Sequence, residues 1–285
     1  MTHSAVRDHP GSPVDMRLVI TDMDGTLLAP DGAIPDAFWP LLTELDRRGI
    51  VFAVASGRQY ETLRGLFGPA SARIAFVAEN GAHVVRAGGE VRVAALPRDV
   101  ADRLVDSVRE LSTQRDIGLV WCGRHSAYIE RGDEAFAREA AVFYDRLERV
   151  DDLHEVTDVP LKFAAFDAGG ADVAAPFFEE ACRPCRVVAS SGCWLDIMDP
   201  DQNKGLAVRA LKDDLGVTAD QVVAFGDYLN DLEMLAEATH SYAMGNAHAE
   251  VRRLARYVAP PNHEYGVLST IADLLERLPR DPVPA

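Results

Sequence analysis

The sequence predicts an α/β protein in which a doubly wound parallel sheet carries an inserted α+β domain. Short apolar runs recur towards both ends of the chain, and each ends in polar residues: LVIT (18–21), VFAVAS (51–56), IAFVAEN (74–80), VVAFGD (222–227) and SYAMGN (241–246). Continuous rather than alternating apolarity is typical of strands that are covered on both faces. Helical patterns lie between the runs, and strands alternating with helices favour a parallel sheet.

Two of the predicted helices have clear amphipathic spacing. In NKGLAVRALKDDLG and NDLEMLAEAT the apolar residues recur on one helical face, and Gly216 suits the C-terminal cap of the first helix. Doubly wound sheets bind ligands at the carboxyl ends of their strands. The polar residues that end the apolar runs are therefore the first candidates for a functional site.

The middle of the chain has a different pattern. A helix at 99–114 is followed by two strand-like runs, 117–123 and 125–130, and a helix around 172–182 is followed by 186–191 and 193–198. Helix followed by two adjacent strands, occurring twice, predicts an α+β domain with an antiparallel sheet. We expect a discontinuous core at 16–87 and 199–285, an inserted domain at 88–198, and a flexible tail at 1–15.

Charge and hydropathy exclude several classes of partner. The 285-residue chain has a formal net charge of −16, which disfavours binding to nucleic acid or to an anionic membrane surface. No apolar stretch approaches the length of a membrane span, and the start of the chain lacks the apolar segment of a secretory signal. These features predict a cytoplasmic protein.

The cysteines do not form a recognisable metal site. CRPC (182–185) has CxxC spacing, which is compatible with half a zinc site or with a redox pair. A structural zinc site needs four ligands, and no second CxxC or HxxxH pattern is present. We therefore expect ordinary free thiols here.

Charged and hydroxyl residues stand at the ends of the predicted strands or at the starts of helices. In chain order they are Asp22, Asp24, Thr26, Ser56, Lys204, Asp227 and Asp231. Several have an ordinary structural explanation: Asp24 suits a turn, Ser56 with Gln59 suits a capping box, and Asp231 suits a helix start. Lysine at a helix start is mildly unfavourable, so Lys204 calls for another explanation.

These residues lie within four short motifs, DMDGTL, SGR, NKG and GDYLND. In this order the motifs resemble those of the haloacid dehalogenase-like phosphohydrolases, and the resemblance extends from Arg17 to about Leu278. An α+β insertion between the second and third motifs resembles the Cof-type branch of that family, whose large cap covers the active site.

The resemblance implies a role for each acidic motif residue. Asp22 would be the nucleophile that forms an aspartyl-phosphate, and Asp24 would act first as a general acid and then as a general base. Asp22, Asp227 and the backbone carbonyl of Asp24 would bind Mg²⁺, which prefers oxygen ligands. Asp231 would contact the metal directly or support its ligands.

The remaining motif residues would bind the substrate phosphate. Lys204 would offset the repulsion between the nucleophile and the phosphate dianion. The resemblance also implies phosphate contacts from hydroxyl, amide and basic groups at Thr26, Ser56, Gly57, Arg58, Asn80 and Asn230. Asn230 is equally compatible with a simple helix cap, and we expect Asn262 and His263 to form a turn.

We therefore predict a Mg²⁺-dependent phosphatase of small phosphorylated metabolites, such as sugar phosphates. Two alternatives remain open. A phosphomutase would use the same nucleophile and return the phosphoryl group to a sugar, and a non-catalytic metabolite-binding protein would keep only the fold.

Overall fold

The computed structural model describes residues 14–189 and 192–278, so residues 1–13 of the expected flexible tail lie outside the described part. The chain divides into two compact units. The core domain comprises residues 14–56, 68–91 and 203–278, and the cap domain comprises residues 57–67 and 92–202. The segment Gly57–Phe67, which we expected in the core, groups with the cap domain.

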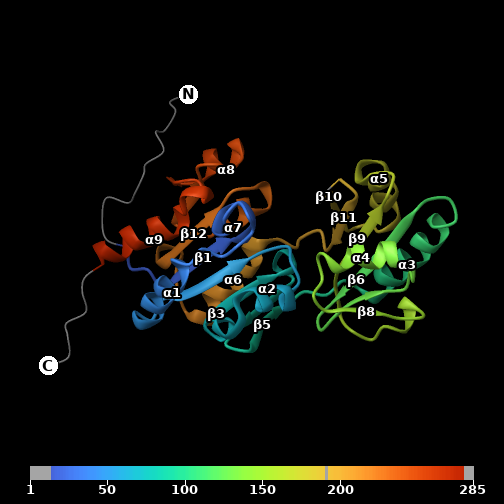
Figure 1. Ribbon diagram of the computed structural model, residues 1–285, viewed down its shortest axis with the longest axis horizontal. Coiled ribbons are helices and arrows are strands. Elements are labelled where there is room, and N and C mark those ends of the chain that lie inside the picture. The colour runs from blue at the N-terminus through green and yellow to red at the C-terminus, as the bar shows by residue number, and fades with distance from the viewer. Residues whose placement is uncertain (1–13, 190–191, 279–285) are drawn as a thin grey trace. The chain divides into compact units, whose positions relative to one another are not determined.

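The core domain contains a doubly wound sheet, as predicted (Figure 1). Its strand order is β14-β13-β12-β1-β2-β3-β4-β5, with parallel pairing from β14 to β3 and an antiparallel β3–β4 pair. The strands are β1 (Leu18–Asp22), β2 (Val51–Ala55), β3 (Ile74–Ala78), β4 (His83–Arg86), β5 (Gly89–Val93), β12 (Val222–Gly226), β13 (His240–Met244) and β14 (Tyr257–Ala259). Every residue of β1 and β12 is buried, which explains their continuous apolarity.

Two groups of helices flank this sheet (Figure 1). The helices are α1 (Phe38–Arg47), α6 (Lys204–Leu215), α7 (Leu232–Ala236), α8 (Ala249–Leu254) and α9 (Gly266–Arg277). Helix α1 packs on α9, while α7 packs on both α6 and α8. Strands β2 and β3 are added on one side of β1, and strands β12, β13 and β14 are added on the other side. Crossovers between parallel strands are right-handed, so connections that run in opposite directions along the sheet place their helices on opposite faces. As predicted, Gly216 ends α6 in a left-handed conformation, with φ +65°.

The cap domain is built on a six-stranded sheet of order β10-β11-β9-β6-β7-β8. Its strands are β6 (Ile117–Gly123), β7 (Ala127–Ile129), β8 (Leu147–Arg149), β9 (Pro160–Asp167), β10 (Arg186–Ala189) and β11 (Trp194–Met198). Its helices are α2 (Tyr60–Phe67), α3 (Arg98–Leu111), α4 (Glu134–Ala141) and α5 (Ala171–Ala181). The predicted repeat of a helix and two strands corresponds to α3-β6-β7 and α5-β10-β11. The apolar core of the cap domain includes Trp121, Phe163 and Phe178.

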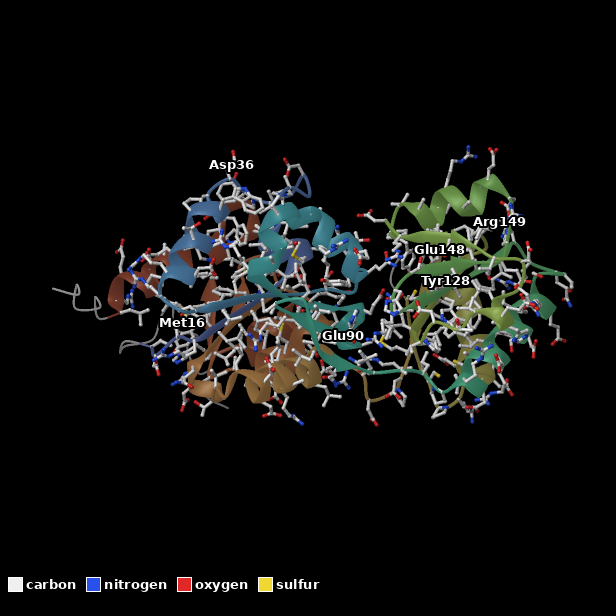
Figure 2. All side chains as sticks on the ribbon, turned by 90° about the horizontal axis from the view of Figure 1, so that it is seen from below. Met16, Asp36, Glu90, Tyr128, Glu148 and Arg149 are labelled. Atoms are coloured by element: carbon white, nitrogen blue, oxygen red, sulfur yellow. The ribbon has the colours of Figure 1, made fainter. Side chains whose placement is uncertain are left out.

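One edge of the cap sheet differs from the predicted antiparallel arrangement. β7 and β8 pair in parallel, with Tyr128 opposite Glu148, and Figure 2 labels both residues. The reason is helix α4, which was not predicted and provides the crossover that a parallel pair requires. The other described pairs of this sheet are antiparallel.

Single helical turns connect several elements of the described chain. They are Met23–Leu27, Gly68–Arg73, Glu79–Gly81, Leu153–Glu155, Ala219–Gln221, Leu229–Asp231 and Asn262–Glu264. Among the described residues, none of the helices has the length and apolarity needed to cross a membrane.

Candidate active site

The parallel sheet brings distant acidic residues to one edge. Asp22 ends β1, and Asp227 follows β12, the strand that pairs directly with β1. The turn Met23–Leu27 leaves this edge with Gly25 at φ +79°. A Cβ atom at Gly25 would lie 2.4 Å from Oδ2 of Asp227, so the turn approaches Asp227 more closely than a side chain there would allow.

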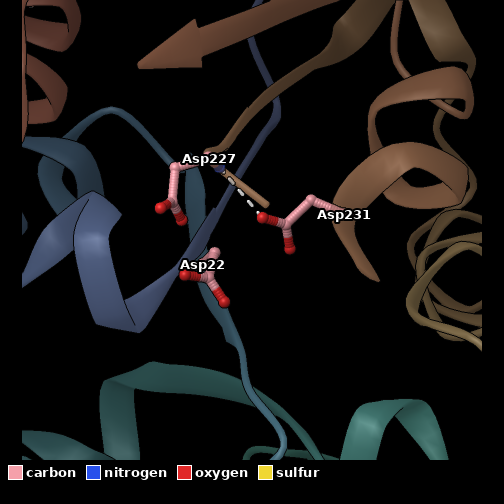
Figure 3. A group of neighbouring side chains, drawn as sticks. All are labelled: Asp22, Asp227 and Asp231. Atoms are coloured by element: carbon pink, nitrogen blue, oxygen red, sulfur yellow. Dashed lines mark hydrogen bonds between the residues drawn. The ribbon is translucent and has the colours of Figure 1, made fainter. Parts of the chain in front are cut away.

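Three carboxylates converge at this point (Figure 3). Asp22, Asp227 and Asp231 each offer an oxygen, and these oxygens all lie within 4.8 Å of one another. Asp22 and Asp231 are buried, and Asp227 is half-buried. Such a cluster of hard oxygen ligands suits Mg²⁺.

Lys204, the first residue of α6, lies against two of these carboxylates. Its Nζ donates to Oδ1 of Asp22 at 2.5 Å and to Oδ1 of Asp231 at 2.7 Å. The ammonium group is fully buried. These bonds explain the position of Lys204 at a helix start, because the buried carboxylates compensate its charge.

Asp231 has hydrogen bonds at both oxygens. Oδ1 accepts from Lys204, and Oδ2 accepts from the backbone N–H groups of Asp227 and Tyr228 at 3.0 and 3.1 Å. Figure 3 shows the bond between Asp231 and Asp227. Asp231 therefore holds both the lysine and the backbone of its neighbouring aspartate.

The electrostatics of the cluster follow from its burial and its charges. Burial, together with Asp231, raises the pKa of Asp22 although Lys204 opposes the shift. Burial also raises the pKa of Asp227 to about 6. Burial alone would lower the pKa of Lys204, but Asp22 and Asp231 outweigh it and raise that pKa. Three carboxylates and one ammonium give −3 + 1 = −2 when all are ionised, so a divalent cation would balance the site.

The other residues of the first motif lie close by. Thr26 is buried, and its hydroxyl donates to Oδ1 of Asp227 at 2.9 Å. Asp24 is exposed and lies outside the three-carboxylate group. The sequence grouped Asp24 and Thr26 with the metal and phosphate residues, and the structure adds that Thr26 orients the Asp227 carboxylate.

Ser56, Asn80 and Asn230 form a second chain of contacts in the core domain. The amide N–H of Asn80 donates to the carbonyl of Ser56 at 3.0 Å, and Nδ2 of Asn230 donates to Oδ1 of Asn80 at 3.3 Å. Asn80 adopts φ +53°, a conformation that asparagine tolerates better than most residues. The structure thus brings three predicted phosphate-binding residues together.

The remaining predicted residues, Gly57 and Arg58, belong to the segment that groups with the cap domain. There the carbonyl of Gly57 accepts a hydrogen bond from Nζ of Lys162 at 3.0 Å. The alternative explanation for Ser56, a capping box with Gln59, lacks the bond from the Ser56 backbone N–H to the Gln59 side chain, because that N–H donates to the carbonyl of Val77 at 2.8 Å. The Gln59 side-chain amide instead bonds both backbone groups of Arg146, because a tertiary partner takes both its donor and its acceptor.

Two asparagines near the site were missed or assigned differently. Nδ2 of Asn246 donates to the carbonyl of Gly25 at 2.8 Å, and Nδ2 of Asn262 donates to the carbonyl of Leu28 at 3.0 Å. The sequence does contain a signal for Asn246: it is a polar residue just after the apolar strand β13, and Asp227 occupies a similar place after β12. Asn262 does lie in a turn, as expected, but its side chain also supports the first motif.

Comparison with known proteins agrees with this geometry. A family model described as haloacid dehalogenase-like hydrolase matches residues 19–271. The chain is 33% identical over 271 residues to 5-amino-6-(5-phospho-D-ribitylamino)uracil phosphatase YbjI of Escherichia coli (strain K12), covering 92% of this chain and 97% of the relative. It is 28% identical to an HMP-PP phosphatase of Cronobacter sakazakii, covering 81% of this chain and 85% of the relative.

Solved structures give the same result for the fold. A protein of Streptococcus mutans UA159 superposes with a TM-score of 0.78 at 29% identity, covering 92% of this chain and 99% of that one. A haloacid dehalogenase-like hydrolase of Bacteroides thetaiotaomicron superposes with a TM-score of 0.80 at 23% identity, covering 91% and 99%. The chain therefore belongs to the haloacid dehalogenase-like hydrolases, in their Cof-type phosphatase branch, and is a phosphoric monoester hydrolase.

Proposed function

We propose that this phosphatase depends on Mg²⁺ and hydrolyses small phosphorylated metabolites through an aspartyl-phosphate on Asp22. The observation that carries the proposal is the buried contact between Asp22 and Lys204 inside a cluster of three carboxylates. A carboxylate nucleophile must approach a phosphate dianion, and a fixed cation beside it reduces their repulsion. Lys204 supplies that cation.

Mg²⁺ fits the donor set of the cluster. The carboxylates of Asp22 and Asp227, with the backbone carbonyl of Asp24, would hold it, and the ion would supply positive charge to the transferring phosphoryl group. Asp231 is better suited to a positioning role, because its two oxygens already accept from Lys204 and from two backbone amides. This assigns Asp231 to the support of the metal ligands rather than to the ligand set.

Proton transfer in this scheme belongs to Asp24. Its carboxyl group is exposed two residues after the nucleophile, and it would protonate the leaving alcohol and then take a proton from the attacking water. Hydroxyl, amide and basic groups would bind the phosphate oxygens; these are Thr26, Ser56, Gly57, Arg58, Asn80 and Asn230. Closure of the cap domain would exclude bulk water and select the leaving group.

The names of the relatives suggest the first substrates to test. Curated relatives act on 5-amino-6-(5-phospho-D-ribitylamino)uracil and on HMP-PP. We propose a substrate of similar kind, a small metabolite with a terminal phosphate, and we include sugar phosphates in the test.

The decisive experiment measures inorganic phosphate release from these compounds with Mg²⁺, with EDTA, and with the near-isosteric variant Asp22→Asn. Asp36→Asn is the matched control, because Asp36 is exposed and outside the three-carboxylate cluster (Figure 2). We expect metal-dependent turnover that Asp22→Asn abolishes and Asp36→Asn preserves. Turnover that is unaffected by EDTA or by Asp22→Asn would contradict the proposal.

The two alternatives give different products. A phosphomutase would convert one sugar phosphate into its isomer without releasing phosphate, and chromatography of the reaction mixture detects this. A non-catalytic protein would bind a metabolite but leave it unchanged.

A further inference from the structure

Asn246 connects the end of β13 to the turn that follows the proposed nucleophile. Its Nδ2 donates to the carbonyl of Gly25 at 2.8 Å, while its Oδ1 accepts from the backbone N–H of Asn262 at 3.0 Å. Asn262 in turn donates through its own Nδ2 to the carbonyl of Leu28 at 3.0 Å. The two asparagines thus hold the turn Met23–Leu27 at Gly25 and at the residue that follows it.

The bond to Gly25 has a directional consequence. The carbonyl of Gly25 and the N–H of Thr26 belong to one planar trans peptide and point in opposite directions. Holding the carbonyl towards Asn246 therefore fixes the direction of the Thr26 N–H. Glycine has no Cβ to restrict rotation of this peptide, so the restraint has to come from a partner such as Asn246.

We propose that Asn246 is a positioning residue that orients the Gly25–Thr26 peptide for phosphate binding and keeps Thr26 against Asp227. The inference rests on the proposed function, since it assigns the peptide a task in that reaction. Asn246 itself is exposed, so its replacement leaves the apolar core unchanged. Its contribution is to geometry, where small displacements have large effects on rate.

The test compares Asn246→Asp with Asn262→Asp. Asn246→Asp keeps the acceptor for Asn262 but removes the donor to Gly25, whereas Asn262→Asp adds the same charge and leaves the bond to Gly25 intact. With p-nitrophenyl phosphate and Mg²⁺ we expect Asn246→Asp to lower kcat by about 10- to 100-fold, with KM and the melting temperature close to wild type. We expect a clearly smaller effect from Asn262→Asp.

A second readout separates this inference from the proposed function. Hydrogen exchange of peptides that contain residues 23–28 should accelerate in Asn246→Asp and not in remote peptides, whether or not p-nitrophenyl phosphate is hydrolysed. Wild-type exchange in Asn246→Asp, or equal losses of kcat in both variants, would overturn the inference. An inactive wild type with accelerated exchange in Asn246→Asp would refute the proposed function but leave the restraint on the turn supported.

An independent observation concerns the CRPC segment of the cap domain. Cys182 is buried at the end of α5, and Cys185, three residues later, is half-buried. The backbone N–H of Cys185 donates to the carbonyl of Cys182 at 2.8 Å, which closes a tight turn between them. The single S–H of Cys182 donates to the carbonyl of Phe178 at 2.6 Å.

We propose that Cys182 and Cys185 form a site of thiol–disulfide exchange with a low-molecular-weight disulfide. Cys185, the more accessible thiol, would attack one sulfur of the oxidant as the thiolate, forming a mixed disulfide and releasing one thiol. Cys182 would then lose its proton to solvent and attack Sγ of Cys185, releasing the second thiol. The two cysteines are oxidised to a disulfide, and the oxidant is reduced to two thiols.

The local environment supports this order of events. The neighbouring thiol of Cys182 lowers the pKa of Cys185, and the interaction with Cys185, together with burial, raises the pKa of Cys182. The thiolate is the reactive form, so the accessible cysteine is also the more readily ionised one.

Mass spectrometry of the full chain after treatment with glutathione disulfide tests the proposal. We expect the wild type to lose the mass of two hydrogen atoms, and Cys182→Ser to retain one glutathione on Cys185. Cys193→Ser is the matched control, since Cys193 is also a half-buried free thiol, and it should behave as wild type. Glutathione attached to Cys193 before Cys185, or an unchanged wild-type mass, would refute the proposal.

Discussion

The ammonium group of Lys204 lies 2.7 Å from the Asp231 carboxylate, and neither side chain is exposed to solvent. The same nitrogen contacts Asp22, so one cation compensates two buried carboxylates from different parts of the chain. Removing one partner from a buried ion pair leaves an uncompensated charge, which is strongly destabilising. The site and the stability of the core domain are therefore coupled through Lys204.

Lys204→Met tests this coupling. Without the ammonium group three carboxylates remain close together, so the free energy of unfolding near neutral pH should fall by about 3–5 kcal/mol. The kcat should fall by about 100-fold or more, because the charge beside the nucleophile is lost. Lys212→Met is the control: Lys212 pairs with Glu237 outside the cluster, and its loss should leave kcat unchanged. Denaturant unfolding and phosphate release measure the two effects, and wild-type kcat in Lys204→Met would contradict the assignment.

Asp231→Asn distinguishes a positioning residue from a metal ligand. The amide can still accept from the backbone of Asp227, but it no longer balances the charge of Lys204. We expect Mg²⁺ affinity and kcat to fall by about 10- to 100-fold without being abolished. Asp227→Asn, which alters a proposed ligand, should remove measurable binding. Calorimetric titration with Mg²⁺ compares the two variants. An equal loss of Mg²⁺ affinity in both would show that Asp231 is a metal ligand.

Gly25→Ala should disrupt the site through a steric clash. The new Cβ would lie 2.4 Å from Oδ2 of Asp227, at a backbone φ of +79°. We expect loss of Mg²⁺ binding and of turnover as Asp227 is displaced. Gly216→Ala is a matched control, since Gly216 has φ +65° with open space around it. It should lose about 1 kcal/mol of stability through backbone strain and keep its activity. Activity in Gly25→Ala equal to that in Gly216→Ala would disprove this close approach.

His154 predicts a pH dependence of cap stability. Hydrogen bonds to Asp106 and Asp102 raise its pKa, so the folded state binds a proton more tightly than the unfolded state. The stabilisation from this proton is complete below about pH 6.5, the pKa of histidine in the unfolded chain. It is lost as the pH rises through the higher pKa that His154 has in the folded protein. Thermal unfolding of wild type and His154→Gln across this range measures it. The gap between the two melting temperatures should narrow with rising pH, and a constant gap would refute the prediction.

Several features of the molecule were predictable because they depend on local sequence. The apolar runs at 18–21, 51–56 and 222–227 became buried strands, and their ends marked the site edge. Gly216 was recognised as a cap because left-handed backbone at a helix end favours glycine. The repeated helix-strand-strand pattern also identified the mixed α+β character of the cap domain.

Other features depend on which segments become neighbours. Helix α4 and strand β8 were missed, and their pairing with β7 gives the cap sheet a parallel edge. Gln59 illustrates the same effect at a single residue, since its spacing from Ser56 is compatible with a local capping box but its side chain bonds to the backbone of Arg146. Tertiary partners outweighed local preferences in both cases.

Local sequence specifies the strands, the order of the motifs and the residue types that end each strand, because burial and turn formation act over short distances. How those residues combine depends on long-range packing of the folded chain. Lys204 meets Asp22 from 182 positions away, Asn246 meets Gly25 from 221, and Asp231 turns both oxygens to partners within the protein. Such contacts follow from the order β13-β12-β1 in the sheet, which places distant strand ends side by side and which no single segment encodes.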